Sequence, residues 1–349
     1  MNRIDLGAHG WARSGGSRAR GYAHLDDRFR TAAELAATLD ACTTDAAWIG
    51  TVGRLNGCFA IVTERDGRVL AAMDRVRSIP LFYALGSDGV HLSDNAYLVL
   101  PAEAAGVDAA ADIEFRLTGY VTGRETLRSG VFQLEAGELI GFDSSPALAP
   151  ERHRYHRFRH QDFLAADTSD LIARLDGVHA GVFRRLIDGV GGRPIVIPLS
   201  GGYDSRLIGV ALRDMGARNV VCYSYGVPGN WEARISQELA RYLGFRWEFV
   251  PYSAERWRGW TASDRFAEYF HAAGNLTSVP HIQDWPAVLE LQREARVPPD
   301  SVFVPGHSGD FLAGSHIPTS YGRRTSIARR EVLDSLQNAH YSLWDWPAG

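Results

Sequence analysis

Apolar and polar positions alternate in two different ways along the chain, and the change predicts two regions. Between 58 and 93, short apolar runs are separated by turn residues. The runs on either side of Asp66-Gly67, and those on either side of the Gly-Ser-Asp-Gly stretch at 86–89, each predict a β-hairpin. We therefore expect a sheet-rich, antiparallel α+β domain over 22–143.

The segments that flank this domain have a different composition. Residues 11–21 are rich in Arg, Gly and Ser, and we expect them to form a mobile leader before an ordered part that begins near Tyr22. The alanine-rich stretch 31–42 predicts a short helix. Residues 144–167 contain many Pro, Arg and His residues in their first part, which is typical of a surface linker between domains.

Strands and helices alternate in the second region, 168–349. Apolar residues recur at steps of three and four after Thr168 and Ser169, which predicts a helix capped by one of these two residues and packed on a sheet. The further predicted elements are a strand at 194–199, a helix at 204–215, a strand at 219–226, a helix at 231–243 and a strand at 246–250. This alternation predicts a parallel, doubly wound α/β sheet.

Composition excludes several classes of protein. The 349 residues carry 37 Lys+Arg, all of them arginine, and 41 Asp+Glu, so the net charge is −4 and there is no broad basic face for nucleic acid. The three cysteines lack the spacing of a disulfide framework or of a cysteine-based zinc site. No apolar run is long enough to span a membrane. We expect a cytoplasmic protein of enzyme size.

One string between a predicted strand and a predicted helix carries the strongest chemical signal. It reads Leu-Ser-Gly-Gly-Tyr-Asp-Ser over 199–205. Gly201 and Gly202 let backbone N–H groups approach phosphate oxygens, and Ser200 and Ser205 add hydroxyl donors at a helix N-terminus. Asp204 is a candidate carboxylate for a magnesium ion that bridges phosphates. The alternative is an ordinary Gly-Gly turn that leads into a helix.

This string resembles the SGGxDS pyrophosphate-binding loop of the ATP pyrophosphatase (PP-loop) family, and its surroundings resemble the synthetase domain of asparagine synthetases. Residues 222–226 are similar to the segment that lies against adenine in that family, and 232–244 are similar to the helix that follows. The resemblance implies ATP and Mg²⁺ as cofactors, with Leu199 and Tyr225 as nucleotide contacts.

A second stretch, 302–314, resembles the family's Ser-Gly-Glu-Gly-x-Asp-Glu loop after a strand. The resemblance implies that Gly306 belongs to the nucleotide loop and that Asp310 is a second magnesium carboxylate, paired with Asp204. His307 and Phe311 stand where the family usually has glutamates. Both departures remove negative charge, so the acyl substrate or the metal arrangement is expected to differ from that of aspartate activation.

Two further family features are matched less closely. The family has a catalytic glutamate between its two signatures, and Glu268 is the nearest candidate; the alternative is a solvated helix residue. The family also has a lysine downstream of the second signature, whereas this chain contains no lysine and ends about forty residues after it. We expect the ATP-binding domain to be C-terminally incomplete.

Residues 51–142 resemble the N-terminal-nucleophile glutaminase domain of asparagine synthetases. The matching stretches begin at Gly53, at Asp74 and at Leu134. Glutamine hydrolysis in that family needs a cysteine at the mature N-terminus, whose α-amine activates the thiol. Here Asn2 follows Met1, and Cys58 falls inside a strand motif. We expect a glutaminase-like scaffold without glutaminase activity.

Together these features predict an AMP-forming amide ligase that adenylates a small carboxylate for attack by ammonia or an amine. The expected partners are these small molecules, with a homodimer possible and with neither nucleic acid nor a membrane involved. The alternative is a non-catalytic nucleotide-binding module, which the absent lysine, His307 and Phe311 favour. A tRNA-thiolating enzyme of the same loop superfamily is disfavoured, because paired cysteines and a basic surface are missing.

Overall fold

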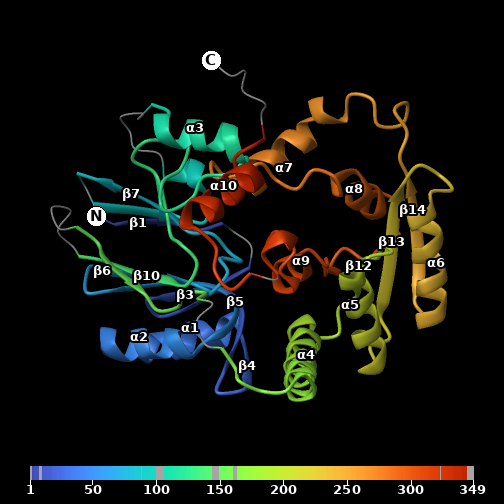
Figure 1. The fold of residues 1–349 in the computed structure, drawn as a ribbon. Helices are drawn as coiled ribbons and strands as arrows, with labels where there is room; N and C mark the ends of the chain where they lie inside the picture. Colours follow the sequence, from blue (N-terminus) through green and yellow to red (C-terminus); the bar gives the residue numbers. More distant parts are fainter. Residues whose placement is uncertain are drawn as a thin grey trace. The chain divides into compact units, whose positions relative to one another are not determined.

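The computed structural model describes residues 2–7, 10–87, 89–99, 106–143, 149–159, 163–322 and 324–343. The chain divides into two compact units, which can be followed by colour in Figure 1. The first unit comprises 1–163, 267–280 and 340–349, and the second comprises 164–266 and 281–339. The two units therefore interleave along the chain, whereas the sequence pattern predicted one unit after the other.

A seven-stranded sheet forms the centre of the first unit. Its strands follow the order β11 (Glu151–Arg154), β10 (Glu138–Phe142), β6 (Arg68–Met73), β5 (Asn56–Arg65), β3 (Ser17–Leu25) and β2 (Trp11–Ser14), with β4 (Arg28–Thr31) also paired to β3. Neighbouring strands are antiparallel throughout. The predicted hairpin at Asp66-Gly67 is confirmed, and both turn residues have the positive φ that a two-residue hairpin turn needs.

Two predictions about the flanks of this sheet are wrong. Residues 11–21 are not a mobile leader, because they form β2 and the first half of β3. Ser17 and Ala19 of β3 are fully buried and alternate with partly exposed arginines; this two-residue period was hidden because the buried positions are small rather than strongly apolar. The expected linker contributes the edge strand β11, although 144–148 and 160–162 lie outside the described residues.

A second, four-stranded sheet completes the first unit, with the order β1 (Arg3–Asp5), β8 (Gly89–Ser93), β7 (Phe82–Gly86) and β9 (Phe132–Gln133). The predicted hairpin of β7 and β8 is confirmed, and β1 runs parallel to β8. This unit is therefore not purely antiparallel.

Alternate residues of β5 join two different cores of the first unit. Phe59 and Ile61 pack with the helices α1 (Ala32–Asp40) and α2 (Asp45–Arg54), whereas Ala60 packs toward the second sheet. Helices, large sheet and small sheet thus form successive layers. The predicted helix at 31–42 is confirmed as α1, whose N-cap Thr31 forms a capping box with Glu34.

The second unit contains a four-stranded sheet that is parallel throughout, as predicted. Its order is β14 (Arg246–Pro251), β13 (Val220–Gly226), β12 (Ile195–Pro198) and β15 (Val302–Phe303). The helices α4 (Thr168–Val190), α5 (Tyr203–Asp214) and α6 (Trp231–Leu243) supply buried residues to one face, and α8 (Trp285–Arg293) supplies Ala287 and Leu291 to the other. Because helices cover both faces, the sheet is doubly wound.

Helix α4 differs from the prediction in its N-cap residue and in which of its apolar residues are buried. Its N-cap is Asp167, rather than Thr168 or Ser169. Phe183 and Val190 are buried against the sheet, as expected, whereas apolar residues of the first half are exposed, Ile172 by 55% and Val178 by 58%. The predicted packing therefore holds only for the second half of this helix.

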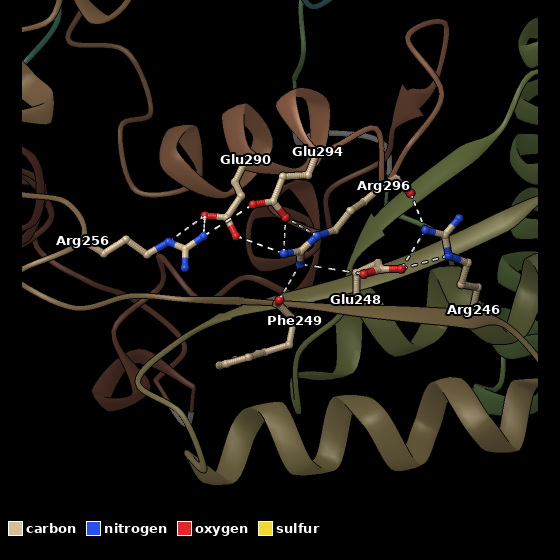
Figure 2. Close-up of polar contacts among 7 residues, drawn as sticks. All are labelled: Arg246, Glu248, Phe249, Arg256, Glu290, Glu294 and Arg296. Atoms are coloured by element: carbon tan, nitrogen blue, oxygen red, sulfur yellow. Dashed lines mark hydrogen bonds and ion pairs between the residues drawn. The ribbon is translucent and has the colours of Figure 1, made fainter.

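Charged residues connect α8 to the edge strand β14, as Figure 2 shows. The Arg296 guanidinium donates to the Phe249 carbonyl oxygen at 2.8 Å and to Oε1 of Glu290 at 3.2 Å. Arg256 donates to the other oxygen of the same Glu290 carboxylate at 3.0 Å. Glu290 is only 5% exposed, and the two arginines balance its buried charge.

The remaining elements are short or peripheral. They are η1 (Ala96–Leu98), α3 (Ala109–Thr118), η2 (Trp260–Ala262), α7 (Asp264–Gly274), α9 (Ser308–Ala313), η3 (Thr319–Tyr321) and α10 (Arg329–His340). Over the described ranges, none of the helices has the length and apolar character needed to cross a lipid bilayer.

Candidate functional site

The order of the parallel strands indicates where a ligand site belongs in the second unit. The chain runs from β12 to β13 and then to β14 on one side, and returns to place β15 on the other side of β12. Ligands of doubly wound sheets bind at the carboxyl ends of the strands where the order reverses. A ligand site is therefore expected at the segments that follow β12 and β15.

Hydrogen bonds of Ser200 and Ser205 hold the segment after β12 in a tight turn. The backbone N–H of Leu199 donates to the Tyr223 carbonyl oxygen at 2.9 Å, which extends the pairing of β12 with β13 by one residue. The Ser200 backbone N–H then donates to Oγ of Ser205, and the Ser200 hydroxyl accepts from the Gly202 N–H, both at 3.1 Å. These bonds hold the turn against the first residues of α5, whose N-terminal amide groups have no partner within the helix.

The segment after β15 lies directly against the start of α5. A Cβ atom at Gly306 would lie 2.9 Å from the Ser205 nitrogen, and one at Gly309 would lie 2.1 Å from Oδ1 of Asp204. Only glycine permits this approach at Gly309. The stretch expected to be a loop contains the short helix α9, with Asp310 in its first turn.

A cavity of about 260 Å³ opens at these two strand ends. The residues that line it are Pro198, Leu199, Ser200, Gly202, Asp204, Ser205, Tyr223, Ser224, Tyr225, Glu232, Gln283, Asp284, Gly306, His307 and Asp310. Four of these side chains are carboxylates, and the described lining contains no arginine. The cavity is therefore acidic, and it suits cations, or anions that arrive with cations bound.

Tyrosines form one wall of this cavity. The Tyr225 hydroxyl donates to Oδ1 of Asp284, and the Tyr225 ring stacks on Tyr252 with 5.0 Å between ring centroids. Burial raises the pKa of Tyr225 far above its ordinary value, and the hydrogen bond to the Asp284 carboxylate adds to the shift. Tyr225 is therefore a neutral donor at all physiological pH values.

Comparison with known proteins gives a limited set of similarities. No family model matches the chain. The chain is similar to a probable glutamine-hydrolyzing asparagine synthetase of Acanthamoeba polyphaga mimivirus, with 38% identity over 65 residues. This match covers 18% of the chain and 12% of the viral protein, so the chain spans about an eighth of that relative's length.

Solved structures give similarities at low identity. The NH3-dependent NAD synthetase of Campylobacter jejuni matches with a TM-score of 0.28 and 14% identity, over 48% of this chain and 72% of that one. The glutamine phosphoribosylpyrophosphate amidotransferase of B. subtilis matches with a TM-score of 0.26 and 14% identity, over 71% and 52%. TM-scores this low do not establish a shared fold.

The structure gathers most of the predicted site residues. Those that line the single cavity described above are Leu199, Ser200, Gly202, Asp204, Ser205, Tyr225, Gly306 and Asp310. Gly201 lies beside them but faces Trp231 of α6. Glu268 is exposed on α7, in a segment that groups with the first unit, and it is not among the described lining residues. The functional roles of all these residues stay predictions.

Sequence reasoning missed several residues that shape the cavity, among them Asp284 and Gly309. Asp284 is the N-cap of α8, and the Asp-Trp-Pro sequence at 284–286 is a recognisable helix start. Its approach to Tyr225, 59 residues away along the chain, has no local signal. Gly309 was read only as part of a motif, since its contact with Asp204 depends on how two distant loops pack.

Proposed function

We propose that the protein is an ATP-dependent, AMP-forming amide ligase of the PP-loop class. A carboxylate oxygen of the substrate attacks the α-phosphorus of ATP, and the bond to the β-phosphate breaks to release pyrophosphate. Ammonia or an amine then attacks the acyl carbon, loses a proton and displaces AMP. The substrates are a small carboxylate and a nitrogen donor, without nucleic acid.

The observation that carries this proposal is the meeting of two motif segments in one cavity. Ser200 to Ser205 follow β12, Gly306 to Asp310 follow β15, and the two segments touch where Gly309 lies against Asp204. The N-terminus of α5 and the hydroxyls of Ser200 and Ser205, which are 3.1 Å apart, lie along this cavity, and such groups suit a pyrophosphate ligand. The sequence similarity to an asparagine synthetase supports the same class of reaction.

The acidic lining agrees with magnesium-bound ATP. Asp204 and Asp310 both line the cavity, and carboxylate oxygens are the donors that Mg²⁺ prefers. These two residues would hold the ion, which neutralises charge on the leaving pyrophosphate when bound. The protein's own contribution is to position the two substrates and to exclude water from the acyl group.

We propose that the first unit is a scaffold without glutaminase activity. Cys58 lies within β5 opposite Tyr22 and is only partly exposed, and Cys42 lies just beyond α1. Both cysteines lie in the interior of the chain, so neither carries the free α-amine of its own that activates an N-terminal nucleophile. Replacing Cys58 by alanine should leave glutamine-dependent turnover at its negligible level, and a glutaminase rate that disappears on this replacement would overturn the proposal for this unit.

The second candidate is a module that binds ATP without splitting it. His307 and Phe311 stand where asparagine synthetases usually have glutamates, and Phe311 is 57% exposed rather than part of the cavity wall. These two positions are the structural reason to test binding separately from turnover.

The deciding experiment is incubation of the full chain with Mg-ATP, ammonium and a panel of amino and sugar acids, with nucleotide products separated by chromatography. AMP and pyrophosphate that appear only with one acid would support the ligase and identify its substrate. ADP and phosphate would overturn it. Unchanged ATP, together with measurable ATP binding that Asp204→Asn abolishes, would favour the non-catalytic module.

A further inference from the structure

Two histidines and a carboxylate converge beside the proposed phosphate loop. His281 precedes α8, Asp284 occupies the N-cap position of that helix, and His307 follows β15. One ligand atom from each residue lies within 4.8 Å of the other two. The two imidazole rings have 4.9 Å between centroids, and Nε2 of His281 is 3.6 Å from Oδ1 of Asp284.

We propose that His281, Asp284 and His307 form a binding site for a divalent transition-metal cation of the Zn²⁺ type. Zn²⁺ binds imidazole nitrogen and carboxylate oxygen at about 2.0–2.2 Å, so two ligand atoms of a tetrahedral shell are about 3.3–3.6 Å apart. The separation of Nε2 of His281 from Oδ1 of Asp284 already fits this range, and separations of up to 4.8 Å within the cluster need an inward movement of about 1–1.5 Å by the two exposed histidine side chains. Mg²⁺ prefers an all-oxygen shell, so this donor set selects against it.

Groups behind the ligands hold Asp284 in place. The Tyr225 hydroxyl donates to Oδ1 of Asp284. The Tyr252 hydroxyl donates to the Gln283 carbonyl oxygen at 2.9 Å and accepts from the Ala287 N–H at 3.0 Å, which fixes the turn that carries the carboxylate. Outer hydrogen bonds of this kind orient the ligands of metal sites and raise their affinity.

The position of this site beside the cavity indicates a role for the ion in binding a substrate. Asp284 and His307 also line the cavity that contains Asp204 and Asp310. Three protein ligands leave at least one coordination position for water or a substrate oxygen, which is the pattern of catalytic rather than structural zinc sites. The ion would be distinct from the magnesium proposed at Asp204 and Asp310, and its binding does not depend on whether the cavity accepts ATP.

The test uses the full chain, freed of metals with a chelator and kept without nucleotide. Zn²⁺ is titrated by calorimetry, and Co²⁺ is titrated with its visible absorption as a report on nitrogen coordination. We expect one ion per chain with affinity far above that for Mg²⁺. His281→Ala and His307→Ala should each weaken Zn²⁺ binding by more than the roughly 10–100-fold that loss of an outer-shell partner costs, and Tyr225→Phe should fall within that range.

Three variants make the outcome specific. His316→Ala removes an exposed histidine of the segment that follows α9, outside the cluster, and should bind Zn²⁺ like the wild type. His307→Cys should restore binding, because thiolate also ligates Zn²⁺. Asp204→Asn should lose Mg-ATP but keep Zn²⁺, so failure of one proposal is distinguishable from failure of the other. Zn²⁺ affinity that is unchanged in His281→Ala and His307→Ala, or no stronger than that for Mg²⁺, would overturn the site.

Discussion

Gly309→Ala should disable the nucleotide site while leaving the fold intact. The added Cβ would lie 2.1 Å from Oδ1, 2.2 Å from Cγ and 2.7 Å from Cβ of Asp204. Carbon atoms in contact are separated by about 3.5–4.0 Å, so Asp204 and the segment around Gly309 must move apart by at least about 1 Å. The Asp204 carboxylate then leaves its place at the cavity.

The expected loss of ATP-dependent turnover follows from that displacement of Asp204. A catalytic group misplaced by about 1 Å costs about 100-fold in rate, and we expect the ATP-dependent turnover of Gly309→Ala to fall by that factor. Stability should change less, because rotation of the Asp204 side chain relieves the overlaps with Oδ1 and Cγ, and only the contact with its Cβ needs the two segments to separate. Alanine also favours the short helix α9 by about 0.5–1 kcal/mol relative to glycine, which offsets part of the remaining cost.

A matched control and a double mutant complete the test. Gly177 lies within α4, and a Cβ there would meet nothing within 4 Å, so Gly177→Ala should keep wild-type turnover and gain about 0.5–1 kcal/mol of stability. If Gly309→Ala acts through Asp204, combining it with Asp204→Asn should add no further loss. Wild-type turnover in Gly309→Ala, or additive losses in the double mutant, would refute this reasoning.

Two further predictions concern stability. Arg296→Met leaves the buried Glu290 carboxylate with one arginine and the Phe249 carbonyl oxygen without this donor. It should therefore lower the free energy of unfolding, measured by urea denaturation, by about 2–4 kcal/mol. Arg256→Met removes a more exposed partner and should cost less, and equal losses in the two variants would contradict this ranking. Burial raises the pKa of the Cys222 thiol to about 12 from an ordinary value of 9.0, so the folded chain keeps its proton longer than the unfolded chain. The free energy of unfolding should therefore fall as the pH rises from about 9 toward 12, and Cys222→Ala should reduce that slope; an unchanged slope would show that other groups cause it.

Local patterns predicted the elements that depend on local chemistry. The turn at Asp66-Gly67 forms because these two residues tolerate positive φ, and α1 starts at Thr31 because its side chain caps the helix. The strands at 11–25 were not predicted, because they depend on contacts with neighbouring strands rather than on local chemistry. In the first half of β3 the buried residues are Ser17 and Ala19, whose burial depends on close approach of neighbouring strands rather than on their own hydrophobicity.

The same distinction separates the site residues that the sequence predicted from those that it missed. The segment 199–205 was predicted because strand, glycines and helix are consecutive in sequence, and the structure places most of it at one cavity. Asp284 and Gly309 were missed because their positions depend on contacts with Tyr225 and Asp204, which are distant in sequence. The contacts between Arg296 and Glu290 have no sequence signal either. They connect β14 to α8, the helix whose N-cap is Asp284.

The charges of the cavity lead to a final prediction, that ATP binding depends strongly on a divalent cation. The chain contains no lysine, and the described lining contains four carboxylates without an arginine. Within the described lining, the groups that attract the phosphates are backbone amides, the serine hydroxyls and the N-terminus of α5, which carries about half a positive charge. Repulsion from two nearby carboxylates costs about 3 kcal/mol in total, so replacing Mg²⁺ with a chelator at constant ionic strength should weaken ATP binding by roughly 100-fold or more. Calorimetric titration measures this directly, and ATP affinity that survives chelation would show that arginines outside the described lining, rather than metal ions, bind the phosphates.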